Sequence, residues 1–297
     1  MDNSKKYLDP IMLSKIDNMA LRAKLVVEGY LVGKHKSPYH GFSVEFAEHR
    51  TYGQGDEIKH IDWKLYGKTD RYYVKRFEEE TNLRSYILLD TSKSMNYKSK
   101  NITKLKYGES LTAGLTHLMI NQKDAVGLIL FDDVIRKYIP PKTSKSHKNI
   151  IFSSLNKCRA GKNTNIKLIL DSMAERIKKS GLVILISDLL DDPKNVMKGL
   201  NHFRHNKQEV IVFHLIDKQE FNFTFNERTR FTDMETGETI TTDPWHIQSS
   251  YQDKIKLFIK KYKKECGDLK IDYVPIFTDQ GFDLALSEYI RKRHKSN

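Results

Sequence analysis

The chain has 297 residues, of which 39% are hydrophobic, so it is long enough for one large domain with a packed core and an extension. No apolar run approaches the roughly 18 residues of a membrane-spanning helix, and the amino terminus leads into no apolar signal region, so we expect a cytoplasmic protein without a membrane span. The two cysteines, Cys158 and Cys266, have no metal-type spacing and predict no disulfide framework.

The net charge of +13 is compatible with an acidic protein partner, nucleic acid or an anionic membrane surface. The distribution of this charge argues against nucleic acid. In segment 254–264 the apolar residues Ile255, Phe258, Ile259 and Tyr262 recur at helical spacing, so the lysines between them form the solvent-exposed face of an amphipathic helix. No basic platform interleaved with aromatic residues is evident, so we do not expect a nucleic-acid partner.

The first predicted element is a helix. Apolar residues recur every three or four positions over Ile11–Tyr30, which predicts one amphipathic helix that ends near Gly29 and Gly33. A short strand is predicted at Phe42–Phe46. The alternation over Tyr73–Phe77 is typical of a half-exposed strand.

A polar segment between these two strands contains Gly53, Asp56, Asp62 and Trp63, and Arg76 follows it. Its glycine pair lacks the third glycine and the preceding apolar strand of a nucleotide-binding loop. The segment is either a docking surface for a partner or a structural brace across the sheet edge, with Trp63 buried and Asp62 paired with an arginine. Because buried tryptophans and paired acids are common in folded proteins, we favour the brace.

Beyond this segment, buried strands alternate with helices. Apolar strands are predicted at Tyr86–Leu89, Val126–Phe131, Leu182–Ser187, Val210–Ile216 and Ile271–Pro275, and helices at Lys104–Asn121, Ser146–Asn156, Ile166–Ile177, Val196–Phe203, Lys254–Lys264 and Phe282–Arg291. An antiparallel strand at Arg136–Ile139 should end at Pro140 and Pro141, and residues 217–247 form a polar excursion. The alternation predicts a doubly wound, mostly parallel α/β sheet over residues 82–297, preceded by a helix and strand extension over residues 1–81.

One predicted strand ends in a distinctive group of polar residues. The apolar run Tyr86–Leu89 leads directly into Asp90, and Ser92 and Ser94 follow at alternate positions. Ligands of open α/β sheets bind at the carboxyl ends of such strands, and alternate residues of an extended segment point the same way. The carboxylate and two hydroxyls therefore suit a hard cation such as Mg²⁺, although Asp and Ser are also preferred where a helix begins.

Two more polar residues belong to loops at the same edge of the predicted sheet. Thr164 precedes a helix, and Asp188 follows a later buried strand. We predict a Mg²⁺ or Mn²⁺ site in which Ser92, Ser94 and Thr164 are direct ligands. In this site Asp90 and Asp188 hold ordered waters. Because its direct protein ligands are neutral, the ion should attract an anionic oxygen from elsewhere.

The pattern Asp90-x-Ser92-x-Ser94, with the distant Thr164 and the strand-end Asp188, resembles the metal-ion-dependent adhesion site of von Willebrand factor A domains. The resemblance implies a von Willebrand factor A-like, Rossmann-type fold. It also implies that a Glu or Asp of a protein partner completes the metal coordination.

A longer series of motifs over residues 12–293 resembles bacterial A-domain proteins that are encoded beside MoxR-type AAA+ ATPases. The motifs are Tyr52–Asp56, Ile61–Trp63, Arg76–Glu78, Asp124–Leu128 and Ile186–Leu189. This resemblance implies a protein-binding adaptor that works with a MoxR-type AAA+ ATPase in protein maturation or complex assembly, with the ATPase or its client presenting the acid to the metal. The chain departs from the family at 161–164, where glycines usually precede the threonine.

The enzyme alternative is a Mg²⁺-dependent phosphotransferase of the haloacid dehalogenase type, which also places a strand-end Asp beside the metal. Such enzymes need a second acid two residues after the nucleophile, as general acid and base. Here Ser92 holds that position. The sequence also has neither a Gly-x-Ser-x-Gly elbow nor a phosphate-binding P-loop. We therefore predict that the chain is not an enzyme.

Overall fold

The structure is a computed structural model, and the residues that it describes are 9–35, 49–53, 63–75, 83–99, 102–161, 165–225, 227–233 and 237–295. The predicted strand at Phe42–Phe46 and the predicted domain boundary between residues 81 and 82 lie outside these ranges.

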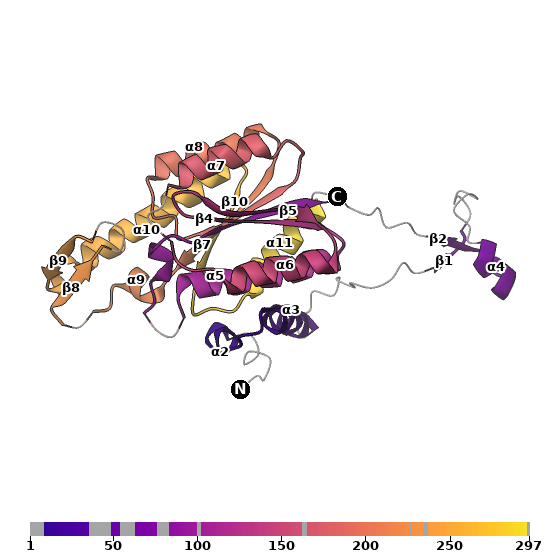
Figure 1. The fold of residues 1–297 in the computed structure, drawn as a ribbon, viewed down its shortest axis with the longest axis horizontal. Helices are drawn as coiled ribbons and strands as arrows, with labels where there is room; N and C mark the ends of the chain where they lie inside the picture. Colours follow the sequence, from indigo (N-terminus) through magenta and orange to yellow (C-terminus); the bar gives the residue numbers. More distant parts are fainter. Residues whose placement is uncertain are drawn as a thin grey trace.

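A six-stranded sheet forms the centre of the molecule (Figure 1). Its strands are β3 (Arg84–Asp90), β4 (Ala125–Phe131), β5 (Ile135–Lys142), β6 (Leu182–Ser187), β7 (Glu209–Ile216) and β10 (Asp272–Phe277). Their order across the sheet is β10-β7-β6-β3-β4-β5, and every neighbouring pair is parallel except β4 and β5. The predicted doubly wound, mostly parallel α/β sheet is confirmed.

Helices cover both faces of this sheet (Figure 1). One face carries α2 (Pro10–Ser14), α3 (Met19–His35), α5 (Lys104–Asn121), α6 (Lys145–Asn156) and α11 (Asp283–Lys295), and the other carries α7 (Ile166–Arg176), α8 (Pro193–His205) and α10 (Pro244–Asp268). Strand β3 has an unbroken apolar run because its side chains point alternately toward the two covered faces of the sheet. Ile87 and Leu89 belong to the first hydrophobic cluster, whereas Tyr86 and Leu88 belong to the second.

The amino-terminal helix was predicted as one element but is broken into two. Helix α2 ends at Ser14, and Asn18 then accepts hydrogen bonds from the backbone N–H groups of Ala20 and Leu21, which caps a new helix. The predicted stop at Gly29 is also wrong, because α3 continues to His35. Its buried residues, among them Val26, pack on α5, so tertiary packing outweighs the low helix propensity of glycine.

Strand β5 runs through both prolines to Lys142, so the predicted end at Pro140 is wrong. The strand lies at the edge of the sheet, and both prolines lie where its pairing with β4 shifts register, opposite the single residue between Val126 and Leu128, so they do not interrupt a regular ladder.

The polar excursion after β7 contains regular structure. It consists of α9 (Lys218–Asn222) and a hairpin of β8 (Thr229–Thr232) and β9 (Thr239–Thr242), and it leads into the long helix α10. Helix α9 begins with a capping box: the Asp217 side chain accepts a hydrogen bond from the backbone N–H of Glu220, and the Glu220 side chain accepts one from the backbone N–H of Asp217.

Strands β1 (His49–Thr51) and β2 (Tyr73–Lys75) pair antiparallel and flank α4 (Trp63–Thr69). The predicted burial of Trp63 is wrong, because 56% of its surface is exposed. The aromatic residues of this unit contact one another instead of a sheet face: Trp63 lies edge-on to Tyr66, and Tyr66 stacks on Tyr72 with centroids 4.5 Å apart. Asp56, Asp62 and Arg76 lie outside the described residues.

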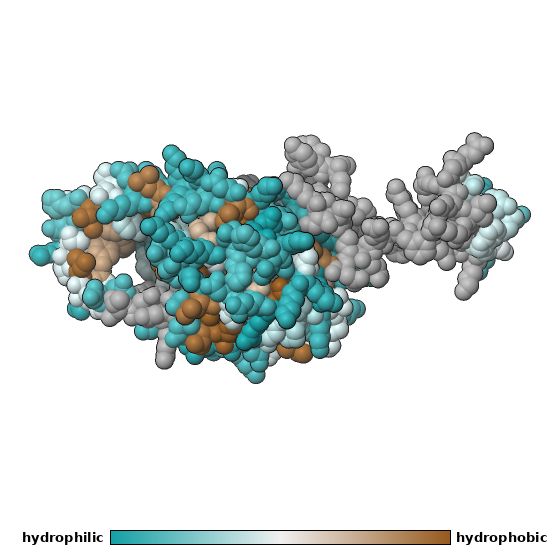
Figure 2. All heavy atoms as spheres, turned by 90° about the horizontal axis from the view of Figure 1, so that it is seen from above, coloured by the Kyte–Doolittle hydropathy of each residue, from teal (hydrophilic) through white to brown (hydrophobic). Residues whose placement is uncertain are grey.

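In the described part of the chain, no helix is both long and apolar enough to cross a membrane. The face in Figure 2 is mainly hydrophilic, with small, separate hydrophobic patches.

Candidate functional site

The site is centred on Asp90, the last residue of β3, whose side chain is fully buried. Strands β3 and β6 are in register up to Leu89 and Ile186, so Ser187 lies beside Asp90 at the carboxyl ends of the two strands. The Ser187 hydroxyl donates a hydrogen bond of 2.6 Å to one carboxylate oxygen of Asp90. The backbone N–H of Ser92 donates to the other oxygen at 2.8 Å. Two neighbouring strands thus hold this carboxyl group in one orientation.

The two serines of the loop after β3 lie together, as the sequence predicts. The hydroxyl oxygens of Ser92 and Ser94 are 3.0 Å apart, and both side chains are buried. Thr91 fixes the start of the loop because its backbone N–H and its hydroxyl both donate to the carbonyl of Phe131 at the end of β4. The sequence-predicted convergence of the carboxylate and the two hydroxyls is present in the fold.

Asp188, in the loop after β6, is also brought to this site. Its carboxylate accepts a 2.7 Å hydrogen bond from the ammonium of Lys104, and the same ammonium donates to Glu220 at 3.0 Å. No local sequence pattern identifies Lys104 or Glu220 as site residues, because Lys104 lies 84 residues from Asp188 and 116 residues from Glu220.

Backbone strain marks the same loop. Leu189 is fully buried and has a φ of 54°, which non-glycine residues rarely adopt. Its N–H donates to the Ser187 hydroxyl at 2.9 Å, and its carbonyl accepts from the N–H of Asp191. Strained backbone of this kind concentrates at functional sites, and Ser187 supports both the strained residue and Asp90.

Burial and neighbouring charges shift the pKa values of the titrating groups in this site. Burial and the nearby Asp188 carboxylate raise the pKa of Asp90 to about 7, although the hydrogen bonds from Ser187 and Ser92 act in the opposite direction. Burial alone would lower the pKa of Lys104, but the carboxylates of Asp188 and Glu220 raise it above its usual value. A cation beside Asp90 would therefore offset the cost of burying its negative charge.

Thr164 lies outside the described residues, so its predicted role as a ligand stays a prediction. The described end of its loop is anchored to the site: the N–H of Gly161 donates to the Thr91 carbonyl at 2.6 Å. A Cβ added at Gly161 would come within 1.9 Å of a carboxylate oxygen of Asp132, so a larger residue here would displace the Asp132 side chain. The sequence places a glycine here but does not reveal its acidic neighbour.

The donor atoms fit a hard divalent cation. Two hydroxyl oxygens converge beside a buried carboxyl group, and oxygen ligands of this kind suit Mg²⁺ or Mn²⁺. Within the described ranges, no three His, Cys, Asp or Glu side chains form a metal-binding group.

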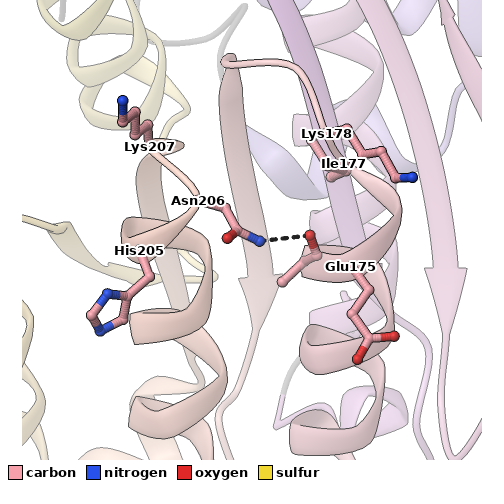
Figure 3. Close-up of a pocket in the computed structure, with 7 residues that line it drawn as sticks. Glu175, Ile177, Lys178, His205, Asn206 and Lys207 are labelled. Carbon is pink, nitrogen blue, oxygen red and sulfur yellow. Dashed lines mark hydrogen bonds between the residues drawn. The ribbon is translucent and has the colours of Figure 1, made fainter.

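A pocket of about 330 Å³ at the carboxyl ends of α7 and α8 is a poor alternative site. It lies at the opposite end of the strands from Asp90. Its charged side chains Glu175, Lys178 and Lys207 point away from one another rather than into a common space (Figure 3), and Asn206 donates to the backbone carbonyl of Ala174.

Comparison with curated proteins identifies relatives in mycobacteria. Uncharacterized proteins of Mycobacterium tuberculosis and Mycobacterium bovis are 21% identical to the chain over 215 residues, which cover 71% of this chain and 67% of the relatives.

Comparison with solved structures gives low sequence identities. The conserved hypothetical protein BatB from Bacteroides thetaiotaomicron is 17% identical, covers 72% of this chain and 99% of its own, and has a TM-score of 0.45. An aerotolerance-related membrane protein from Bacteroides fragilis is 14% identical, with 71% and 99% coverage and a TM-score of 0.48. The SpRpn10 VWA domain is 13% identical, with 68% and 92% coverage and a TM-score of 0.39.

A family model described as "Protein of unknown function DUF58" matches residues 48–256, which is well over half of the chain and includes every predicted site residue. The chain belongs to the DUF58 family.

Proposed function

We propose that the chain is a non-enzymatic, metal-dependent protein-binding adaptor. Mg²⁺ or Mn²⁺ is held by the hydroxyls of Ser92, Ser94 and Thr164, with Asp90 and Asp188 supporting the bound waters. The observation that carries this proposal is the pair of buried hydroxyls 3.0 Å apart beside the fixed carboxyl group of Asp90. When bound, the ion supplies a Lewis-acidic point of attachment for an oxygen anion of another molecule.

The partner is a protein that presents a Glu or Asp side chain. The resemblance to bacterial A-domain proteins encoded beside MoxR-type AAA+ ATPases makes such an ATPase, or its client, the candidate partner in protein maturation or complex assembly. The excess of basic residues would steer an acidic surface toward the chain. We place this function in the cytoplasm.

The geometry of Asp90 supports an adaptor over a phosphotransferase. A nucleophilic carboxylate needs an oxygen that a substrate can approach, whereas the Asp90 side chain is buried and hydrogen bonds from Ser187 and Ser92 reach both of its oxygens. Ser92 also stands where the general acid and base would be required, and its hydroxyl contacts Ser94.

The test is recovery of a partner from lysate on the immobilised chain, in Mg²⁺ and in EDTA. We expect a partner that is retained in Mg²⁺ and lost in EDTA, with Asp90→Ala and with Ser94→Ala. Ser180→Ala, an exposed serine on the far end of the sheet, is the matched control. Equal recovery of the same partner in all of these conditions would show that the metal is not the docking point and would direct attention to the segment from Gly53 to Trp63.

A further inference from the structure

Lys104 is an unusual residue for its position. It is the first residue of α5, where the helix dipole disfavours a positive charge, and its side chain is only 1% exposed. A buried ammonium in such a place needs anionic partners. It has two, Asp188 at 2.7 Å and Glu220 at 3.0 Å, and it also lies over the ring of Tyr97 at 5.6 Å.

The contact with Lys104 determines what Asp188 can do. One carboxylate oxygen of Asp188 accepts from the ammonium, and the other accepts a longer hydrogen bond from the N–H of Leu190. Through the oxygen that faces Leu190, Asp188 would be a weak metal ligand, because the ammonium already compensates its negative charge. The other oxygen could bind a metal only by turning away from the ammonium, which would leave a buried positive charge with a single partner. Breaking a buried ion pair in this way is strongly unfavourable.

We propose that Lys104 is a positioning residue that keeps Asp188 from ligating the metal directly and so limits the affinity of the chain alone for divalent ions. This inference rests on the metal site of the proposed function. The ion is left with neutral hydroxyls and the single nearby charge of Asp90. Much of its charge therefore remains uncompensated, and this charge is available to the acid of a partner.

The same ammonium connects the site to the excursion after β7. Glu220 belongs to the capping box of α9, and Asp217 of that box accepts hydrogen bonds from the backbone N–H and the hydroxyl of Ser99, in the loop that follows β3. The start of α9 is thus bound at two points, to Ser99 in the loop after β3 and to Lys104 at the start of α5. One of the two carboxylates that contact Lys104, that of Glu220, comes from this element.

The test is titration of the full-length chain with Mn²⁺ by calorimetry, after removal of metal with a chelator. The decisive variant is the double change Lys104→Gln with Glu220→Gln. It removes one positive and one negative charge, so the formal charge of the group stays as in the wild type while Asp188 loses its ammonium partner. Glu220→Gln alone is the control for the glutamate, and Lys104→Arg is the conservative variant.

We expect the double variant to bind Mn²⁺ at least about tenfold more tightly than the wild type, because Asp188 is then available as a direct anionic ligand. Lys104→Arg keeps the positive charge beside Asp188 and should bind Mn²⁺ with the affinity of the wild type. If the double variant does not fold, Asp188→Asn provides the test. It should weaken Mn²⁺ binding by less than about tenfold, whereas Asp90→Asn should abolish it, because Asp188 is already neutralised by Lys104.

Each outcome separates this inference from the function it rests on. Affinities within about twofold for the wild type and the double variant, or an Asp188→Asn variant as deficient as Asp90→Asn, would overturn the role of Lys104 and leave the metal-dependent adaptor intact. Binding by the double variant alone would support the role of Lys104 and overturn metal dependence in the wild type. No binding by any variant would overturn both.

Discussion

Ser187→Ala is the substitution that tests most sharply how the site is built. The Ser187 hydroxyl donates to a carboxylate oxygen of Asp90 at 2.6 Å and accepts from the N–H of Leu189 at 2.9 Å, and all three residues are buried. Removing the hydroxyl therefore takes one hydrogen bond from the Asp90 carboxylate and leaves the N–H of Leu189 without its acceptor.

The expected size of the effect follows from these two contacts. A hydrogen bond to a charged acceptor contributes about 1.5–3 kcal/mol, and a buried N–H left without an acceptor costs about 1–3 kcal/mol. Because Ser and Ala differ by a single oxygen, the small cavity left by the substitution adds little to the loss of stability. We expect the free energy of unfolding to fall by about 2–4 kcal/mol, less than the full sum because the Leu189 backbone can relax.

The assay is urea unfolding in EDTA at pH 8, where Asp90 is mainly ionised. Ser180→Ala is the matched control, since its hydroxyl donates to the carbonyl of Lys207 at an exposed position and its loss should cost less than about 1 kcal/mol. A Ser187→Ala variant no less stable than the Ser180→Ala control would refute the view that Ser187 holds Asp90 in place.

Three further predictions concern the rest of the chain. Burial lowers the pKa of His214 from 6.5 to about 4, so between these values the unfolded chain binds a proton at this residue that the folded chain does not, and the contribution of His214 to stability should fall by about 3 kcal/mol as the pH falls through this window. Asp90, with its pKa raised to about 7, acts in the opposite direction over nearly the same window, so the measurement is the difference in melting temperature between the wild type and His214→Gln, which should change with pH in this range. Gly127→Ala places a Cβ 2.8 Å from the Ile139 carbonyl and should lower the free energy of unfolding, measured in urea, by about 1–3 kcal/mol. Gly67→Ala, with open space around it in α4, is the control and should leave this free energy unchanged or slightly raised. Equal effects of the two substitutions would contradict the packing of β4 against β5. Trp63→Ala should change the melting temperature by less than about 2 °C because the ring is mainly exposed, and a large drop would show that it is buried after all.

The parts of the fold that follow from local pattern could be predicted from the sequence. Tyr86–Leu89 has no polar interruption because helices cover both faces of β3, and the polar residues after it lie where parallel strands end. For the same reason Asp90, Ser92, Ser94 and Asp188 could be assigned to one edge of the sheet before their positions were known.

The features that the sequence did not predict depend on contacts between distant segments. The break between α2 and α3 depends on a cap at Asn18 within an otherwise periodic stretch, and the course of β5 through Pro140 depends on its place at the sheet edge. Lys104 appeared as an ordinary helical lysine because its partners come from the loop after β6 and from α9. Charge pairing of this kind leaves no periodic signal in the sequence.

The most direct test of the central claim is a crystal structure of the full chain with Mn²⁺, with anomalous differences measured for the metal. We expect one anomalous peak beside the hydroxyls of Ser92 and Ser94, with Asp188 still bonded to Lys104, and no peak there in crystals of Asp90→Ala. Crystals of the wild type that show no peak between the loops after β3 and β6 at millimolar Mn²⁺, or show one only elsewhere, would contradict this claim.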